Sequence, residues 1–457
     1  MWKYFLFISG VSSFINPKIV AKPSPTSDYS PLLLTPYIEN NDTETARILA
    51  LVTGLTPNIT SYSGFFTIDK KCDSNIFFWF FPSQNNWKKD PVSVWLNGGP
   101  GSSSLIGLFL ENGPYTLTSN GTLILNEYSW TRNSSMIYID NPVGTGFSYS
   151  TLECYLTTQE KIGQGILNAL LQFFKLFPEL SQNSFYLTGE SYAGKYIPAT
   201  AHAIFTSDQK INFNFEGIAI GNGWIDPVNQ LGLGHYLYQL GLIDHHVLME
   251  INSVEENITR QVGQENYEFA CDLMTDLLYM VKSICGFDSL YNFLDENAEE
   301  EGDIASFVDS DEVSSFKKNR FQIAIKWPLF RNLQSKRMCE WASCSKVFII
   351  FFLLNSRVSL ELKYKSPYQP PVSQYYSINL QVRNAIHVGN ATYDYDGTWA
   401  QYHLAYDDMK SVKPWFEEIL ENGYKVLLYS GQLDIIVAYP LTLNFIKVNN
   451  YIITYLM

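Results

Sequence analysis

The sequence predicts an α/β fold, built on a doubly wound, mostly parallel sheet with a helical cap insertion. Five apolar, β-rich runs each stop in a small or polar cluster, as strands buried on both faces of a parallel sheet do. These runs are residues 92–96, 136–139, 185–188, 217–220 and 425–429. Between the second and the third, residues 164–177 have apolar side chains at helical spacing and stop at Pro178.

The polar clusters predict where function lies. The first run ends at Asn97-Gly98-Gly99, the third at Gly189-Glu190-Ser191, and the fifth at Ser430-Gly431-Gln432-Leu433-Asp434. Because the carboxyl ends of parallel strands meet at one edge of a sheet, we expect these clusters to lie together.

Three helical stretches interrupt the strand–helix alternation, at residues 231–242, 245–258 and 266–282. They predict a cap at 226–375, set between a first core part at 28–225 and a last, incomplete core part at 376–457. Within the cap, residues 316–372 form an anomalous basic segment: positions 316–357 contain nine Lys or Arg against one acid, Glu340. A basic binding loop, an exposed surface loop and a segment that is not genuine coding sequence all remain open.

Composition excludes two broad classes. Apolar residues make up 46% of the 457 residues, which is ample for a large core and rules out a disordered chain. The net charge of −14 would repel a phosphate backbone, so we expect no nucleic-acid partner.

The six cysteines include no Cys-x-x-Cys pair, which argues against a metal site and leaves their disulfide pairing open.

Features of the N-terminus and the glycosylation motifs indicate the secretory pathway. Lys3 precedes an apolar run at 4–14 that is too short to span a membrane, and we predict a signal peptide at 1–20. The apolar run at 347–354 is also too short, so no transmembrane segment is expected. The six glycosylation sequons begin at Asn41, Asn58, Asn120, Asn133, Asn257 and Asn390.

The cluster at Ser191 has the form of a nucleophile elbow. Gly189-Glu190-Ser191-Tyr192-Ala193 follows a strand and precedes a predicted helix at 195–205, a setting that lifts a serine Oγ above the sheet edge. An alkoxide attacking a carbonyl needs N–H donors where the oxyanion forms. We expect these donors to be the backbone N–H groups of Tyr192 and Gly99. Two other interpretations of the segment Asn97–Gly101 are a structural glycine-rich turn and, with less support from its motif, a phosphate loop.

These segments resemble the serine carboxypeptidases. The two signatures are Val94-Trp-Leu-Asn-Gly-Gly-Pro-Gly-Ser102 and Gly189-Glu-Ser-Tyr-Ala-Gly-Lys-Tyr196. Further similar blocks are Tyr138-Ile-Asp-Asn-Pro-Val-Gly-Thr-Gly-Phe-Ser148, Gly221-Asn-Gly-Trp-Ile-Asp-Pro227, Val382-Arg-Asn-Ala-Ile-His-Val-Gly389 and Tyr429-Ser-Gly-Gln-Leu-Asp434. The resemblance covers roughly residues 63–440 outside the basic segment. The residues in these blocks most resemble those of the vitellogenic-like carboxypeptidase branch.

The resemblance implies an α/β-hydrolase with a helical cap that removes C-terminal residues from peptides at acidic pH, without a cofactor. Ser191 matches the family's nucleophile and Asp434 its triad acid, while Gly99 and Tyr192 match the oxyanion hole. The group that binds the substrate carboxylate is matched by Asn97, Glu111 and Glu190, with Trp95 beside it. Peptide or protein C-termini are the implied partners, and the location is lysosomal, vacuolar or extracellular. The oligomeric state stays open.

Two glutamates facing a substrate carboxylate suggest a pH dependence. Such a site is tolerable only if one glutamate is protonated, and paired buried carboxyls raise each other's proton affinity. We therefore expect activity to fall as pH rises toward neutrality. For Glu111 the alternative is a solvated acid at a helix end.

The expected triad histidine is missing from its place. In this fold the histidine follows the acid, yet the 23 residues after Asp434 contain none. Of the earlier histidines, we expect His387 to be non-catalytic and His403 to be a surface residue. A triad without its base retains only a rate of about 10³–10⁴-fold over water.

Two other functions therefore stay open beside the carboxypeptidase: an inactive, carboxypeptidase-like binding protein, and an acyltransferase on the same scaffold. A lipase is disfavoured because no lipid-binding lid can be identified. The absence of the family's last strand would also leave an apolar sheet edge uncovered.

Overall fold

The structure is a computed structural model that describes residues 30–55, 59–117, 123–294, 380–394 and 397–448. Its strands are β1 (Tyr62–Asp69), β2 (Ser74–Phe81), β3 (Val92–Leu96), β4 (Tyr115–Leu117), β5 (Leu123–Leu125), β6 (Ser135–Ile139), β7 (Ser184–Glu190), β8 (Asn214–Gly221) and β9 (Lys425–Tyr429). Its α-helices are α1 (Thr35–Glu39), α2 (Thr43–Ala50), α3 (Gln159–Leu176), α4 (Ala193–Thr206), α5 (Leu233–Gln239), α6 (His245–Gly263), α7 (Tyr267–Cys285), α10 (Leu380–Ala385), α11 (Thr398–Asp408), α12 (Lys413–Glu421) and α13 (Tyr439–Lys447).

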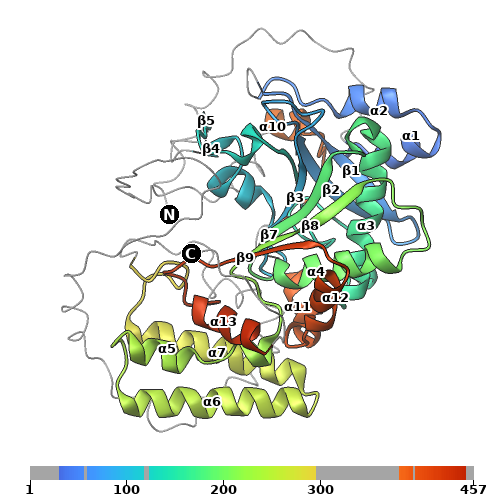
Figure 1. The fold of residues 1–457 in the computed structure, drawn as a ribbon. Helices are drawn as coiled ribbons and strands as arrows, with labels where there is room; N and C mark the ends of the chain where they lie inside the picture. Colours follow the sequence, from blue (N-terminus) through green and yellow to red (C-terminus); the bar gives the residue numbers. More distant parts are fainter. Residues whose placement is uncertain (1–29, 56–58, 118–122, 295–379, 395–396, 449–457) are drawn as a thin grey trace, which may run out of the picture.

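Seven strands form one central sheet in the order β1-β2-β6-β3-β7-β8-β9 (Figure 1). The five strands from β6 to β9 in this order pair in parallel, and they are the five strands that the sequence predicts. The α/β prediction of a mostly parallel sheet is confirmed.

The antiparallel pair β1–β2, which extends the sheet beside β6, was not predicted from the sequence. Strand β2 is, like the other five, an apolar run followed by small and polar residues, at 82–86. In β2, alternate side chains enter different apolar cores: Phe78 and Phe80 lie in one, Phe77 and Trp79 in the other. A strand buried on both faces is a continuous apolar run in the sequence. The periodicity of such a run does not by itself distinguish a strand from a buried helix.

Different elements cover the two faces of the sheet. Helices α3 and α4 pack against one face, where Ile166 and Ile197 belong to the larger core. The other face is covered by the helical turn Gly107–Glu111, by β4 and by α10, with Phe109 and Ile386 in the smaller core. Helix α3 begins at Gln159 and α4 at Ala193, so both predicted helices are present and extend further toward their N-termini than expected.

Helices α5, α6 and α7 form a separate group below the sheet (Figure 1), at the positions where the sequence predicts cap helices. Helix α6 packs against α7, and α7 packs against α11. The predicted signal peptide at 1–20 and basic segment at 316–372 lie outside the described residues, as does most of the second half of the predicted cap.

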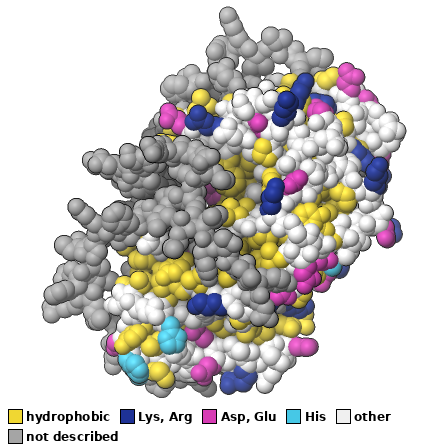
Figure 2. Space-filling model, viewed as in Figure 1, with side chains coloured by type: hydrophobic (Ala, Val, Ile, Leu, Met, Phe, Trp, Pro, Cys, Tyr) yellow, Lys and Arg dark blue, Asp and Glu magenta, His cyan; other side chains and the backbone are white. Residues whose placement is uncertain are grey.

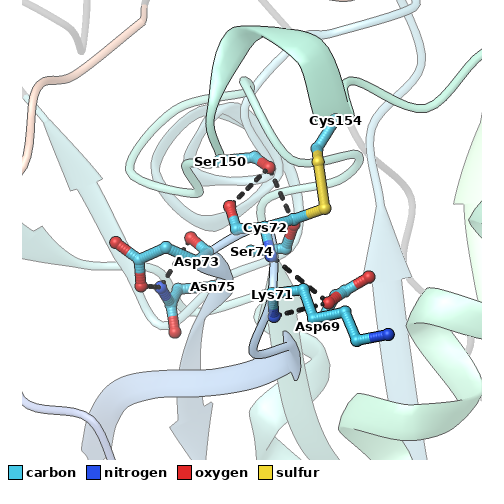
Figure 3. Close-up of a disulfide and its surroundings, with 8 residues drawn as sticks. All are labelled: Asp69, Lys71, Cys72, Asp73, Ser74, Asn75, Ser150 and Cys154. Atoms are coloured by element: carbon cyan, nitrogen blue, oxygen red, sulfur yellow. Dashed lines mark hydrogen bonds between the residues drawn. A yellow bond between two sulfur atoms is a disulfide. The ribbon is translucent and has the colours of Figure 1, made fainter.

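A disulfide joins Cys72, in the turn between β1 and β2, to Cys154, which precedes α3 (Figure 3). The Asp69 carboxylate accepts hydrogen bonds from the N–H groups of Lys71 and Cys72, and Ser150 Oγ donates to the Cys72 carbonyl. The turn is therefore fixed by local hydrogen bonds as well as by the sulfur bridge.

Two other cysteines, Cys271 and Cys285, remain thiols. Both lie on α7, 14 residues apart in the sequence, so about 21 Å of helix separates them and they cannot pair with each other.

Strand β9 is the last strand of the described sheet, and its side chains are only partly covered. Leu427 is 49% exposed, and Tyr439 and Val448 at the ends of α13 are 44% and 45% exposed. Figure 2 shows apolar side chains at the surface on this face of the molecule. Within the described ranges, no helix is long and apolar enough to cross a bilayer.

Candidate active site

Ser191 occupies a strained turn between β7 and α4. Its φ of +57° lies in the left-handed region, which non-glycine residues rarely adopt. Its N–H donates to the Gly221 carbonyl, and its own carbonyl accepts from Gly194 and Trp224, each over 2.9 Å. Bonds to β8 and to the loop after it thus hold the turn, and the sharp bend places Ser191, half-buried, at the carboxyl edge of the sheet.

The loop after β3 passes directly over this turn. A Cβ on Gly98 would lie 2.4 Å from the Tyr192 backbone nitrogen and 2.8 Å from Ser191 Cβ, so only glycine allows the approach. Gly99, the next residue, has a φ of +109°. Tyr192 is the N-cap of α4, where backbone N–H groups have no partner within the helix. The structure therefore brings the two predicted N–H donors, on Gly99 and Tyr192, to the side of Ser191.

Asn97 binds both candidate glutamates. Its Oδ1 accepts hydrogen bonds from Trp95 Nε1 and from the Gly107 N–H, both over 2.9 Å. Because these donors fix the orientation of the amide, Nδ2 faces the carboxyls and donates to Glu111 Oε1 over 3.1 Å and to Glu190 Oε1 over 2.9 Å. The structure thus joins all four residues of the predicted carboxylate-binding group.

The two carboxyls interact directly, and the pKa of each is raised. Loss of hydration raises the pKa of Glu111 well above its usual value, and the charge of Glu190 and a hydrogen bond between the carboxyls raise it further. Burial also raises the pKa of Glu190. Glu111 keeps an exposed side at the end of its helical turn, but its carboxyl group accepts a hydrogen bond from Asn97, as the carboxyl group of Glu190 does. A pair that holds a proton can donate a hydrogen bond to an anionic ligand.

Asp434 lies in the loop after β9. Its Oδ2 accepts from Asn222 Nδ2 over 2.8 Å and from the Val437 N–H over 3.0 Å, and its Oδ1 accepts from the Ile436 N–H over 3.1 Å. Burial raises its pKa to about 6, and the nearby charge of Glu190 contributes. Because only β8 separates β7 from β9, the strand ends that carry Ser191 and Asp434 are about 10 Å apart.

All six histidines are in the described residues, and none of them is hydrogen-bonded to Asp434 there. His387 faces Ser63 Oγ on β1, at the opposite edge of the sheet from β9. His202 pairs with Glu418 and His246 with Glu250. The others lie beside aromatic or acidic side chains, His245 near Tyr238, His403 near Tyr155 and His235 near Glu255.

Asn222 lies in the block Gly221–Pro227 but was not among the predicted site residues. Its amide donates to Asp434 and its Oδ1 accepts from the Gly431 N–H over 2.8 Å. Asn222 therefore fixes the loop that carries the candidate acid. The polar cluster at the end of its strand was the signal that could have identified it.

Lys195, one helical turn after Ser191, was also missed. It is fully buried, and its Nζ donates to the backbone carbonyls of Asp407, Asp408 and Lys410. These carbonyls are at the C-terminal end of α11, where a cation is favourable. The helix that follows the candidate nucleophile is thereby anchored to α11.

The structure describes the asparagines of four of the six glycosylation sequons. Asn41, Asn133 and Asn390 are exposed, whereas Asn257 is half-buried on α6, with its Oδ1 accepting from Arg260 and Gln261. Asn58 and Asn120 lie outside the described residues.

Comparison with known proteins identifies the family of the chain. Residues 52–455 match the family model described as serine carboxypeptidase. The chain is 38% identical to the venom serine carboxypeptidase of Apis mellifera, over 97% of this chain and 84% of the relative. It is 38% identical to the human protein named "Probable serine carboxypeptidase CPVL", over 93% of this chain and 77% of the relative. It is 36% identical to the vitellogenic carboxypeptidase of Aedes aegypti, over 92% of this chain and 78% of the relative.

A solved structure has the same fold. The prohormone-processing carboxypeptidase Kex1(Δ)p of Saccharomyces cerevisiae superimposes with a TM-score of 0.60 at 22% identity, covering 87% of this chain and 79% of that chain. The fold is thus that of the α/β-hydrolases, as predicted. With family signatures, relatives and fold in agreement, this chain belongs to the serine carboxypeptidase family of peptide hydrolases.

Proposed function

We propose that this protein releases C-terminal residues from peptides at acidic pH through an acyl-enzyme on Ser191. The observation that carries the proposal is the Asn97 amide shared by Glu111 and Glu190 (2.9–3.1 Å), because Glu190 is the residue directly before Ser191. A group able to bind a carboxylate thus adjoins the nucleophile, which suits a peptide's free C-terminus.

In the proposed reaction, Ser191 Oγ attacks the carbonyl carbon of the last peptide bond and loses its proton to a base. The oxyanion accepts hydrogen bonds from the N–H groups of Gly99 and Tyr192. The terminal amino acid leaves with a proton, the acyl-enzyme remains, and water then hydrolyses the ester. Asp434 would orient and stabilise the base, which in this family's triad is a histidine.

The terminal carboxylate of the substrate would bind to Asn97 and to the protonated member of the Glu111–Glu190 pair. A neutral carboxylic acid donates a hydrogen bond to an anion, whereas two ionised glutamates would repel it. Trp95, which donates to Asn97 Oδ1, fixes the amide for this task.

A second candidate is a carboxypeptidase-like binding protein. It is favoured by one observation, that the described hydrogen bonds of Asp434 come from Asn222 and two backbone N–H groups and from no histidine. This protein would bind peptide C-termini and hydrolyse them slowly. The acyltransferase would use the same acyl-enzyme and pass the acyl group to an alcohol or amine.

The experiment combines active-site labelling with turnover. The protein is treated with a fluorophosphonate and, separately, with a blocked dipeptide, its C-terminal amide and a matching ester, with Ser191→Ala as the control. We expect labelling that is absent in S191A, and hydrolysis of the free dipeptide in preference to its amide. Binding of the dipeptide without turnover would support the binding protein, and transfer to an added nucleophile in place of hydrolysis would support the acyltransferase.

We also propose passage through the secretory pathway to a lysosomal, vacuolar or extracellular location. The Cys72–Cys154 disulfide supports it, because such bonds persist in oxidising compartments. The exposed sequons at Asn41, Asn133 and Asn390 are available for glycans. A mobility shift of the native protein after glycosidase treatment would test this, and an unshifted protein would count against it.

A further inference from the structure

Asp140, the residue after β6, is a buried carboxylate to which the proposed reaction assigns no role. It is 1% exposed, and three donors converge on it. Its Oδ1 accepts from Ser103 Oγ over 2.6 Å and from the Ser104 N–H over 3.0 Å, and its Oδ2 accepts from the Phe147 N–H over 2.8 Å. Two separate loops therefore meet at one side chain.

The first of these loops is the one that contains Gly99. Ser104, bound by Asp140 through its N–H, uses its Oγ to accept from the Asn97 N–H over 3.2 Å and to donate to the Ile139 carbonyl over 2.6 Å. The segment from Asn97 to Ser104 is thus closed by the hydrogen bond between its ends, and Ser104 ties it to the end of β6. Gly99 lies between them, and its N–H can point at an oxyanion only if the loop keeps this shape.

Ser104 also contacts the helical segment that carries Glu111. The Ser104 carbonyl accepts from the Leu108 N–H over 3.1 Å, in the first turn of the helical segment that ends at Glu111. Asp140 therefore holds the start of the element that carries Glu111 at its end.

Among the described residues, no lysine or arginine forms an ion pair with Asp140, and burial raises its pKa to about 6. An unpaired buried carboxylate is unfavourable for folding. Three donors from two loops nevertheless require a strong acceptor with two oxygens, which only a carboxylate supplies.

We propose that Asp140 is a positioning residue for the loop Asn97–Ser104, holding the Gly99 N–H and the Asn97 amide in register with Ser191. The kinetic consequence rests on the proposed function, whereas the structural consequence does not. Asp140→Asn keeps the size of the side chain but turns one acceptor into an NH₂ group, which must then face a donor.

The experiment compares D140N with two other variants. Ser103→Ala removes one of the three donors with little change in volume. Glu255→Gln is the matched control, because Glu255 is also a buried carboxylate (8% exposed) that accepts from two backbone N–H groups, those of Gly232 and Leu233, but in the cap. Hydrogen exchange of peptides covering 97–111, the rate of fluorophosphonate labelling and the kcat and KM for a blocked dipeptide are measured for each.

In D140N we expect faster exchange confined to residues 97–111 and labelling slowed by about 10²-fold, as a misplaced catalytic geometry causes. The loss of peptidase activity in D140N should be mainly a decrease in kcat, with KM changing much less. S103A should change in the same direction by a smaller factor, and E255Q should match the wild type.

The proposal is overturned if exchange at 97–111 is unchanged in D140N, or if it rises equally throughout the protein, which would mean a purely structural role. Failure of the proposed function has a different signature. A wild-type protein that does not hydrolyse peptides would refute the carboxypeptidase, while the exchange comparison would still decide the role of Asp140.

Discussion

A Cβ on Gly98 would lie 2.4 Å from the backbone nitrogen of Tyr192, closer than real side-chain atoms approach a backbone. The loop that carries one proposed oxyanion donor and the turn that carries the other are therefore in direct backbone contact. No residue larger than glycine fits between them.

Gly98→Ala should accordingly disable the oxyanion site. We expect the loop to move away from Tyr192 and kcat to fall by about 10²–10³-fold, the effect of losing one oxyanion donor. Gly263→Ala is the control, since no atom lies within 4 Å of a Cβ at that helical position. Fluorophosphonate labelling checks the prediction, and equal labelling of G98A and G263A would contradict it.

The raised pKa values of Glu111 and Glu190 predict a pH-dependent KM. Because both are raised above the usual carboxyl value, the pair keeps a proton in mildly acidic solution and loses it as pH rises. We expect KM for a blocked dipeptide to increase between pH 5 and pH 8. In Glu111→Gln, which cannot ionise, this increase should be smaller, and a C-terminal amide substrate serves as the control. A KM independent of pH in the wild type would exclude this role for the pair.

Stability should depend on pH through Asp434. Its pKa of about 6 exceeds the ordinary value of 3.8, so the folded state binds a proton more tightly than the unfolded state. The resulting stabilisation is fully present below about pH 4 and is lost as pH rises through 6. For this group alone we expect the free energy of unfolding to be larger at pH 5 than at pH 7.5, by on the order of 1 kcal/mol.

Urea unfolding at the two pH values measures this difference. Asp434→Asn should remove the Asp434 share, whereas Asp208→Asn, at an exposed carboxyl, should leave the difference intact. The assignment is wrong if D434N retains the full difference.

The Cys72–Cys154 disulfide should contribute strongly to stability, because it closes a loop of 82 residues. Replacing both cysteines by serine should lower the free energy of unfolding by on the order of 4 kcal/mol. Unfolding with and without reductant provides the check. The reductant should destabilise the wild type and leave the C72S/C154S variant unaffected, and a wild type insensitive to it would argue against the bond.

Local signals were sufficient for the parallel part of the sheet and for the turn that carries the candidate nucleophile. The five parallel strands could be found because strands buried on both faces are short apolar runs, and each ends in a polar cluster. The turn at Ser191 could be found because small residues and a following helix occur within a few positions of it. The β1–β2 pair was missed, because a continuous apolar run such as β2 does not by its periodicity alone distinguish a strand from a buried helix.

The amino-acid sequence by itself determined the five parallel strands, helices α3 and α4 beside them and the chemical character of the residues at the strand ends. Only the tertiary structure decided which of those residues meet. Asn97 binds Glu111, 14 positions away, and Glu190, 93 positions away, while Asn222 binds Asp434 across 212 positions. These contacts depend on the order in which strands pair, and strand order is set by the packing of the whole core, which periodicity along the chain does not encode.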